Sequence, residues 1–332
     1  MRANAIQAAR DHWVEKPARL RFTLAGGVVF SAEFPALCWA LRLDLDCFRR
    51  TLPQGVSAEP PVWTGIPAQV RATRLHVPCA RPYPRVTILH DTIRYAPSHY
   101  RRFYIEIQGG FEDYLRKFSG RTRSTWRRKV RRFASASGGA IDFQEYGRAA
   151  TMSEFLVLAR RVSEKTYQER LLDAGIPATG WYREQILQAA ARDEIRGYLL
   201  FHQGQPVAYA LCAADEDTLV VERIGFDPDF AYLNPGTVLL YLLLEKLFAG
   251  KRFRILDLGR GEFPYKEHYA TGNIPCAEIY YFRRSASNLL LVCAHAAAEM
   301  LSGALKSGLE VLGLKDKVRR WLHRLAGGAR VG

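Results

Sequence analysis

Two short polar segments have residue types and a spacing that could carry chemistry. Asn234-Pro235-Gly236-Thr237 has the composition of a helix start, because asparagine caps helices, proline suits the first turn and glycine admits a ligand to the backbone. The segment 256–266 ends an apolar strand in a polar turn that contains two glycines. Free N–H groups and the dipole at a helix start favour a phosphate. Together the two segments predict a phosphate-bearing cosubstrate beside a reaction centre.

The elements that position these segments alternate between strands and helices. A hairpin with a glycine at its tip is predicted over 196–212, a third strand over 217–226 and a buried, almost wholly apolar helix over 235–248. Further predicted strands are 20–24, 73–77, 103–107, 141–146, 253–258 and 277–282. Further predicted helices are 111–133 with a break at 119–120, 151–167, 181–192 and 288–325 with a break near 313, while 55–67 reads as a loop. The pattern therefore predicts an α/β fold.

The composition is that of a folded globular protein. Of 332 residues, 48% are hydrophobic and 12% aromatic, which is ample for a core. The six cysteines lie far apart, without a CxxC pair or a histidine cluster, so we expect reduced thiols, a cytoplasmic location and no metal. Residues 1–30 lack the layout of a signal peptide, and the longest apolar run, 289–298, is too short to span a bilayer.

The net charge of +15 is concentrated in two places. Residues 116–132 hold nine basic side chains and no acidic one, and residues 302–332 hold seven basic and two acidic ones. The rest of the chain is nearly neutral. Local patches on a neutral body indicate a local anionic partner rather than general solubility.

From about 111 to 282 the chain resembles the bacterial acetyltransferase-like family typified by cellulose- and polysaccharide-cluster proteins. That family belongs to the GNAT superfamily and is related to the Fem-type aminoacyl transferases. The segments that carry the resemblance are 121–129, 204–208, 225–228, 235–237, 257–261 and 265–266. The chain departs from standard GNAT enzymes by lacking their glycine-rich pyrophosphate loop, so that 233–237 would have to serve instead.

The resemblance implies an acyl-CoA donor and names the residues that would hold it. The donor-binding candidates are Gly225, Phe226, Asn234, Pro235, Gly236 and Thr237, with Arg127 and Arg128 as partners for its phosphates. The strand before the turn would present a backbone N–H to the thioester carbonyl, where such a donor stabilises the developing oxyanion. An amine or hydroxyl acceptor would then attack directly.

Direct attack needs a proton acceptor and a proton donor for the leaving thiolate. The catalytic candidates are Asp257, Tyr265, Lys266, Glu222 and His268, with Glu262 in the same turn, and the general base is left open among them. Each has a plain alternative role: Asp257 could pair with Arg260, Glu222 and His268 could lie on the surface, and Tyr265 could simply pack. His202, on an apolar strand, is expected to be a satisfied core residue.

The two basic regions allow several partners. The arginine-rich helix could be a solvated face, or it could bind donor phosphates, an anionic acceptor, lipid headgroups or RNA, although Trp126 fits the core stripe and RNA is the less favoured alternative. Residues 309–324 combine leucines with basic residues and Trp321, a composition that suits either a membrane surface or packing on the body.

These observations predict a GNAT-like mixed sheet flanked by helices, with a smaller N-terminal α/β lobe and a C-terminal amphipathic tail. The expected domains are 1–110, a lobe related to a degenerate GNAT unit, 111–285, the acyltransferase, and 286–332, the basic tail. The expected function is acyl-CoA-dependent N- or O-acyl transfer at the cytoplasmic membrane face. The acceptor would be an envelope precursor, either a polysaccharide or lipid-linked sugar or a lipid amine of the sphingoid type. The alternatives are an aminoacyl-tRNA-dependent Fem-type transferase and a non-catalytic assembly protein of a polysaccharide cluster.

Overall fold

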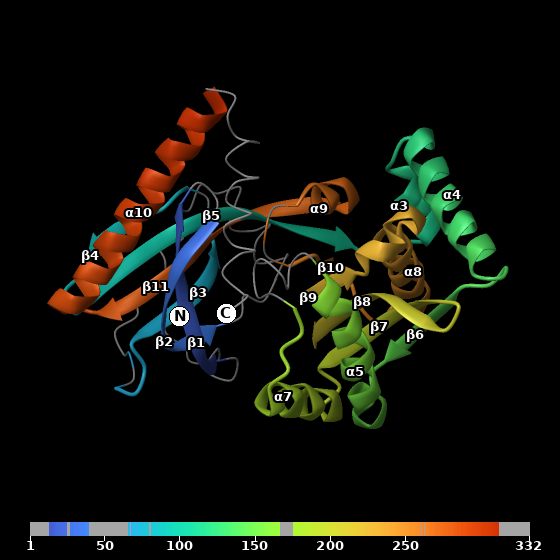
Figure 1. Ribbon diagram of the computed structural model, residues 1–332, viewed down its shortest axis with the longest axis horizontal. Helices are drawn as coiled ribbons and strands as arrows, with labels where there is room; N and C mark the ends of the chain where they lie inside the picture. Colours follow the sequence, from blue (N-terminus) through green and yellow to red (C-terminus); the bar gives the residue numbers. More distant parts are fainter. Residues whose placement is uncertain are drawn as a thin grey trace, which may run out of the picture. The chain divides into compact units, whose positions relative to one another are not determined.

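The computed structural model describes residues 13–24, 27–39, 66, 68–79, 81–166, 175–259, 261 and 263–311 (Figure 1). The chain forms two compact units. The central unit comprises residues 101–274, and the terminal unit comprises residues 1–100 together with 275–332. The strands β5 (Thr92–Glu106) and β11 (Gly272–Arg283) have residues in both units. The predicted domains 1–110, 111–285 and 286–332 follow a different division and stay a prediction.

The central unit is built on a mixed sheet with the strand order β5–β10–β9–β8–β7–β6. Its further strands are β6 (Asp142–Tyr146), β7 (Ile195–His202), β8 (Gln205–Asp215), β9 (Thr218–Phe226) and β10 (Ile255–Asp257). The pair β9–β10 is parallel and the other neighbours are antiparallel. The predicted hairpin and the strand after it are therefore confirmed as the middle of this sheet.

Helices cover both faces of this sheet. On one face lies α8 (Pro235–Gly250), with α3 (Phe111–Arg116) and α4 (Gly120–Ala136) packed against it (Figure 1). On the other face lie α5 (Ala149–Lys165) and α7 (Gly180–Ala191). The 3-10 helix η2 (Pro228–Leu233) joins β9 to α8, and α9 (Pro264–Tyr269) follows β10.

Strand β7 shows why both faces must be covered. Every residue of β7 is buried. Because side chains alternate along a strand, Tyr198 and Leu200 pack into the cluster that contains α8, whereas Leu199 and Phe201 pack into the cluster that contains α5. An apolar strand without polar alternation thus belongs in the centre of a two-faced sheet.

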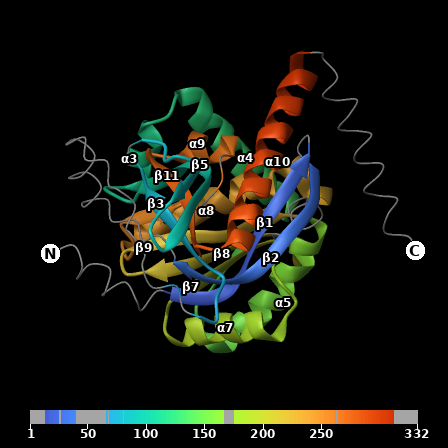
Figure 2. The same cartoon turned by 90° about the vertical axis from the view of Figure 1, so that its left-hand side faces the viewer.

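The terminal unit has its own strands and one long helix. β1 (Trp13–Leu24) pairs with β2 (Gly27–Trp39), and β3 (Ala72–Pro78) lies between β2 and β11. The short β4 (Val86–Ile88) pairs with β5. The helix α10 (Ala286–Val311) lies along β1 (Figure 2).

The prediction of a mixed α/β fold with a sheet flanked by helices and a C-terminal helix is confirmed, including the break between α3 and α4. Two local expectations were wrong. The segment 264–269, expected to be a turn, is the helix α9, and β10 is shorter than expected. The strands β2 and β4 were not predicted. Most of the predicted loop 55–67, and the predicted helix beyond residue 311, lie outside the described residues.

Candidate active site

The strands β9 and β10 separate after a short parallel pairing. Along β9, the strand β10 pairs only with Thr218, Leu219 and Val220, whereas β9 continues to Phe226. Beyond Asp257 the backbone follows β5 instead, with the Leu258 amide donating to the Phe103 carbonyl at 3.0 Å. The edge of β9 beyond Val221, whose carbonyl faces Gly259, therefore has no partner from β10, and its backbone groups on that side can bind a ligand.

A β-bulge lies where the two strands separate. In the pairing of β8 with β9, Leu211 faces Arg223 and Cys212 faces Val221, so Glu222 is the extra residue. A bulge turns the following side chains and twists the strand, and it is frequent next to active sites. Glu222 is exposed there. The bulge thus sets a carboxylate at the point of separation.

Asp257 and Lys266 hold the turn after β10. The Gly259 amide donates to Asp257 Oδ1 at 2.8 Å, and Lys266 Nζ donates to the Gly259 carbonyl at 3.1 Å. Gly259 has φ +73°, and a Cβ at this position would lie 2.5 Å from the Val221 carbonyl oxygen. Only glycine fits, and the two polar side chains fix the turn against the edge of β9.

Asp257 has a second partner that the sequence did not reveal. Arg102 Nε on β5 donates to Asp257 Oδ2 at 2.7 Å, and both side chains are buried. Asp257 therefore forms an ion pair with an arginine 155 residues away, while the expected partner Arg260 lies outside the described residues, as does Glu262. Both carboxylate oxygens of Asp257 therefore accept a hydrogen bond within the protein.

Tyr265 and His268 lie on α9 in different surroundings. Tyr265 stacks on Phe263 and packs against the main core cluster, and burial raises the pKa of its hydroxyl to about 12. His268 is exposed, and its ring meets Trp126 of α4 edge-on at 5.3 Å. Trp126 in turn stacks on Tyr269 with ring centroids 4.5 Å apart. α9 is thus joined to α4 through aromatic contacts.

The start of α8 has the features of an anion site. Asn234 adopts a left-handed conformation with φ +56°, and its side chain makes no capping hydrogen bond. Pro235 has no N–H, and the Gly236 amide has no acceptor among the described residues. Lys129 Nζ of α4 lies 3.5 Å from Thr237 Oγ1. An unfilled amide, a helix dipole and an ammonium group therefore converge here.

Gly225 and Phe226 are the last two residues of β9, shortly before the start of α8. A Cβ on Gly225 would lie 2.8 Å from the Tyr209 ring, so the glycine allows close packing inside the sheet. Phe226 is 41% exposed, and its ring would be 3.2 Å from a Cβ on Gly236. The next residue, Asp227, is buried and accepts a hydrogen bond from Lys165 Nζ at 2.7 Å. The chain between β9 and α8 is thereby anchored to α5.

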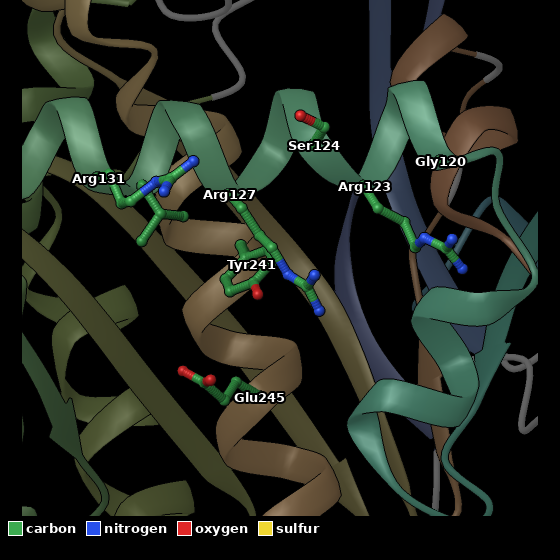
Figure 3. Close-up of a pocket in the computed structure, with 8 residues that line it drawn as sticks. Gly120, Arg123, Ser124, Arg127, Arg131, Tyr241 and Glu245 are labelled. Atoms are coloured by element: carbon green, nitrogen blue, oxygen red, sulfur yellow. The ribbon is translucent and has the colours of Figure 1, made fainter.

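The two arginines expected to bind the donor do not lie at the start of α8. Arg127 donates twice to Glu112, at 2.6 and 2.8 Å, and lines an open pocket of about 600 Å³ with Tyr241 and Glu245 (Figure 3). Arg123 and Arg131 leave α4 on the same flank (Figure 3). Arg128 is exposed elsewhere on α4. Within the described part of the chain, five arginines of α4 have no acidic partner: Arg121, Arg123, Arg128, Arg131 and Arg132.

Sequence reasoning missed Arg102, Lys129 and Lys165 as individual site residues. Lys129 lay within the basic run, but nothing in that run distinguished it from its neighbours. Arg102 and Lys165 contact partners 155 and 62 residues away, a distance that no local motif spans. His202 is buried and bonded to Ser137 Oγ at 2.8 Å, in line with the expectation of a satisfied core histidine. In the part of the chain that the structure describes, no three His, Cys, Asp or Glu side chains are grouped as metal ligands.

Residues 120–267 match the model of the family described as acetyltransferase (GNAT) domain. This stretch, somewhat less than half of the chain, contains α4, the bulged β9, α8, β10 and most of α9.

Two solved structures match this chain at low sequence identity. The FemX crystal structure is 11% identical, with a TM-score of 0.46 over 85% of this chain and 90% of that chain. The L-PGS of Bacillus licheniformis is 11% identical, with a TM-score of 0.44 over 90% of this chain and 96% of that one. The curated proteins gave no match to this chain.

Proposed function

We propose that this protein is an acyl-CoA-dependent acyltransferase of the polysaccharide-cluster branch of the GNAT superfamily. The observation that carries the proposal is the junction of β9 and α8. β9 leaves its parallel neighbour after Val220 and runs into a helix start with an unfilled Gly236 amide and Lys129 close by. A donor with a thioester at one end and a diphosphate further along would fit both features at once.

The residues present would hold such a donor in one orientation, with its diphosphate at the start of α8 and its thioester on β9. The diphosphate would accept hydrogen bonds from the Gly236 amide and from Lys129, and Phe226 would offer an apolar surface to the pantetheine arm. A backbone N–H on the free edge of β9 would bind the thioester oxygen. Because negative charge develops on that oxygen during attack, an oriented donor there lowers the barrier.

We assign the general base to Glu222. It is exposed at the bulge, whereas Asp257 is already bound by Arg102 and the Gly259 amide. The acceptor's amine or hydroxyl attacks the thioester carbon, its proton passes to Glu222, and the C–S bond breaks to release the CoA thiolate, which takes up a proton. Tyr265 keeps its proton at neutral pH, because its pKa is raised to about 12, and can serve only as a hydrogen-bond donor to the leaving sulfur.

We propose an envelope precursor at the cytoplasmic face of the membrane as the acceptor: a polysaccharide or lipid-linked sugar, or a lipid amine of the sphingoid type. The support for an anionic or membrane-held acceptor is the concentration of positive charge. Nine basic side chains lie between residues 116 and 132 without an acidic one. Such a patch attracts anionic surfaces and substrates through its local field.

Donor binding tests the proposal. We expect acetyl-CoA, a long-chain acyl-CoA or free CoA to raise the midpoint of thermal unfolding, because a ligand that binds only the folded state stabilises it. Gly236→Trp should abolish the shift. Gly250→Trp at the other end of α8 is the matched control, since no atom lies within 4 Å of a Cβ built there. No shift with any of the three ligands would refute the CoA donor.

The arginines of α4 favour a second candidate, an aminoacyl-tRNA-dependent transferase. Five of them have no acidic partner among the described residues, which suits a polyanion. This candidate predicts RNA binding that weakens steeply with salt and is lost in the Arg121→Glu/Arg128→Glu/Arg132→Glu variant. If neither CoA nor RNA bound, the non-catalytic assembly role would be the remaining explanation.

A further inference from the structure

The helix α10 buries three polar residues and leaves a row of large apolar residues exposed. Asn288, His295 and Ser302 recur every seven residues, so they lie on one face, and all three are buried. The large apolar side chains that are exposed on this helix are Leu290, Met300, Leu301 and Leu305, with exposed fractions of 72, 66, 58 and 41%. Val292 and Ala296 also pack into the core from the buried side, so the helix has apolar residues on both faces, whereas a surface helix ordinarily has a polar outer face.

The inner face is bonded to the terminal unit. Arg71 Nε donates to Asn288 Oδ1 at 2.8 Å, and the Tyr95 hydroxyl and His295 Nδ1 lie 2.5 Å apart. Arg85 also donates to the Ala296 carbonyl at 3.3 Å. These polar contacts, spread over several turns, fix which side of the helix faces outward.

The outer face has the length and composition of a lipid-contacting surface. Residues 286–305 contain a single charged residue, Glu299, and only 28% of the most apolar window is buried. Twenty helical residues extend about 30 Å, which is close to the hydrocarbon thickness of a bilayer. Besides the four large side chains, Cys293, Ala294 and Ala297 are exposed. An apolar surface of this kind on a folded protein marks an interaction site.

Basic residues bracket the helix. Arg283 and Arg284 precede it and are exposed, and Lys306 follows the apolar window. The sequence 315–330, outside the described residues, adds six basic residues and one acidic residue. This charge distribution is complementary to anionic lipid headgroups on either side of an apolar contact.

We propose that the outer face of α10 lies in the headgroup–acyl boundary of an anionic bilayer, parallel to its plane. By length and composition α10 could also cross a membrane. Crossing would expose Asn288 and His295 to lipid and break their bonds to Arg71 and Tyr95, at a high cost in polar groups left without partners. Lying in the plane keeps these bonds. This inference deepens the proposed function and rests on it for the identity of the acceptor, because an enzyme that modifies a membrane-held acceptor must work at the membrane surface.

Vesicle flotation of the full chain tests the proposal without any donor or acceptor, so its result is independent of the CoA experiment. The wild type should float with phosphatidylcholine vesicles that contain phosphatidylglycerol, and less with pure phosphatidylcholine. Leu290→Lys/Leu301→Lys should lower partitioning by about tenfold or more, since two apolar anchors are replaced by charges. Val157→Lys on α5 is the matched control, because Val157 is 54% exposed outside α10.

Thiol labelling gives a second readout on the unmodified protein. Cys293 is exposed, whereas Cys79, Cys212 and Cys276 are buried and serve as internal references. Anionic vesicles should protect Cys293 from a membrane-impermeant maleimide, as read by peptide mass spectrometry, and alkaline carbonate should release the protein. Three results would overturn the proposal: no flotation with unchanged labelling, protection by self-association without lipid, and retention after carbonate extraction, which indicates a spanning helix.

Discussion

Asp257 and Lys266 lie on either side of Gly259 and bind its amide and its carbonyl. Both residues looked like reaction chemistry in the sequence because they stand in a polar turn after a strand. In the structure both hold the turn that separates β10 from β9, and their catalytic role stays a prediction. Glu222, which lacked any such motif around it, occupies the bulge at the separation point.

Replacing Asp257 by Asn distinguishes positioning from catalysis. The change removes the negative partner of Arg102, which is buried, and breaking one side of a buried ion pair costs about 3–5 kcal/mol. We expect that loss in the free energy of unfolding measured in urea. The double variant Asp257→Leu/Arg102→Met should regain part of it. Full stability of the single variant together with lost turnover would instead make Asp257 the base.

Gly259 and Gly204 offer a matched pair of substitutions to alanine. Both have a positive φ, +73° and +78°, but a Cβ meets the Val221 carbonyl only at Gly259 and nothing within 4 Å at Gly204. Gly204→Ala should therefore cost only the backbone strain, about 1–3 kcal/mol. Gly259→Ala should cost about 1–3 kcal/mol more through overpacking. Equal losses in urea unfolding would show that the turn can move away from β9.

At the scale of elements, the start of α8 depends on α4 lying beside it. Lys129 is one of nine basic residues between 116 and 132, and its place on the helix brings its ammonium group to Thr237. The aromatic contacts of Trp126 with His268 and Tyr269 hold α9 against the same helix. The basic helix therefore contributes one specific cation to the start of α8 and exposes most of the others.

Lys129→Ala should weaken donor binding. A hydrogen bond from a charged group contributes about 1.5–3 kcal/mol, which corresponds to a rise of about tenfold or more in Kd for CoA by calorimetry. Lys117→Ala changes the net charge equally at an exposed site on the end of α3 and should leave Kd nearly unchanged. Equal effects of the two variants would point to a general effect of charge.

At the scale of the whole molecule, many tyrosines are buried, and this predicts loss of stability in alkali. Burial raises the pKa of Tyr83, Tyr265 and Tyr281 to about 12 and that of Cys79 to about 11. Unfolded tyrosine loses its proton near pH 10. Between about pH 10 and 12 the unfolded chain therefore releases protons that the folded chain keeps, and the free energy of unfolding falls as the pH rises.

Urea unfolding between pH 7 and 11, with tyrosinate absorbance as a second signal, measures this. Stability should be nearly constant to about pH 9 and then decline, and tyrosinate should appear together with unfolding. Ionisation of these tyrosines near pH 10 in a protein that stays folded would contradict the prediction.

The sequence by itself determined most of the central unit's elements. Apolar runs and glycine turns identify β7, β8 and β9, and Asn234-Pro235 marks the start of α8, because these signals depend only on neighbouring residues. α9 was missed because its six residues are mostly polar or aromatic and show no helical period, and it is held by packing on α4.

Only the tertiary structure decided which polar side chains are bonded to other residues of the protein and which are exposed. Asp257 is bound by Arg102, Lys266 by the Gly259 carbonyl and Arg127 by Glu112, while Glu222 is exposed at a bulge that exists only in the pairing of β8 with β9. The same holds for α10, whose exposed apolar side is set by the contacts of buried Asn288 with Arg71 and of buried His295 with Tyr95. A sequence pattern specifies local conformation, whereas the partner of a polar side chain depends on residues that the fold brings from far along the chain.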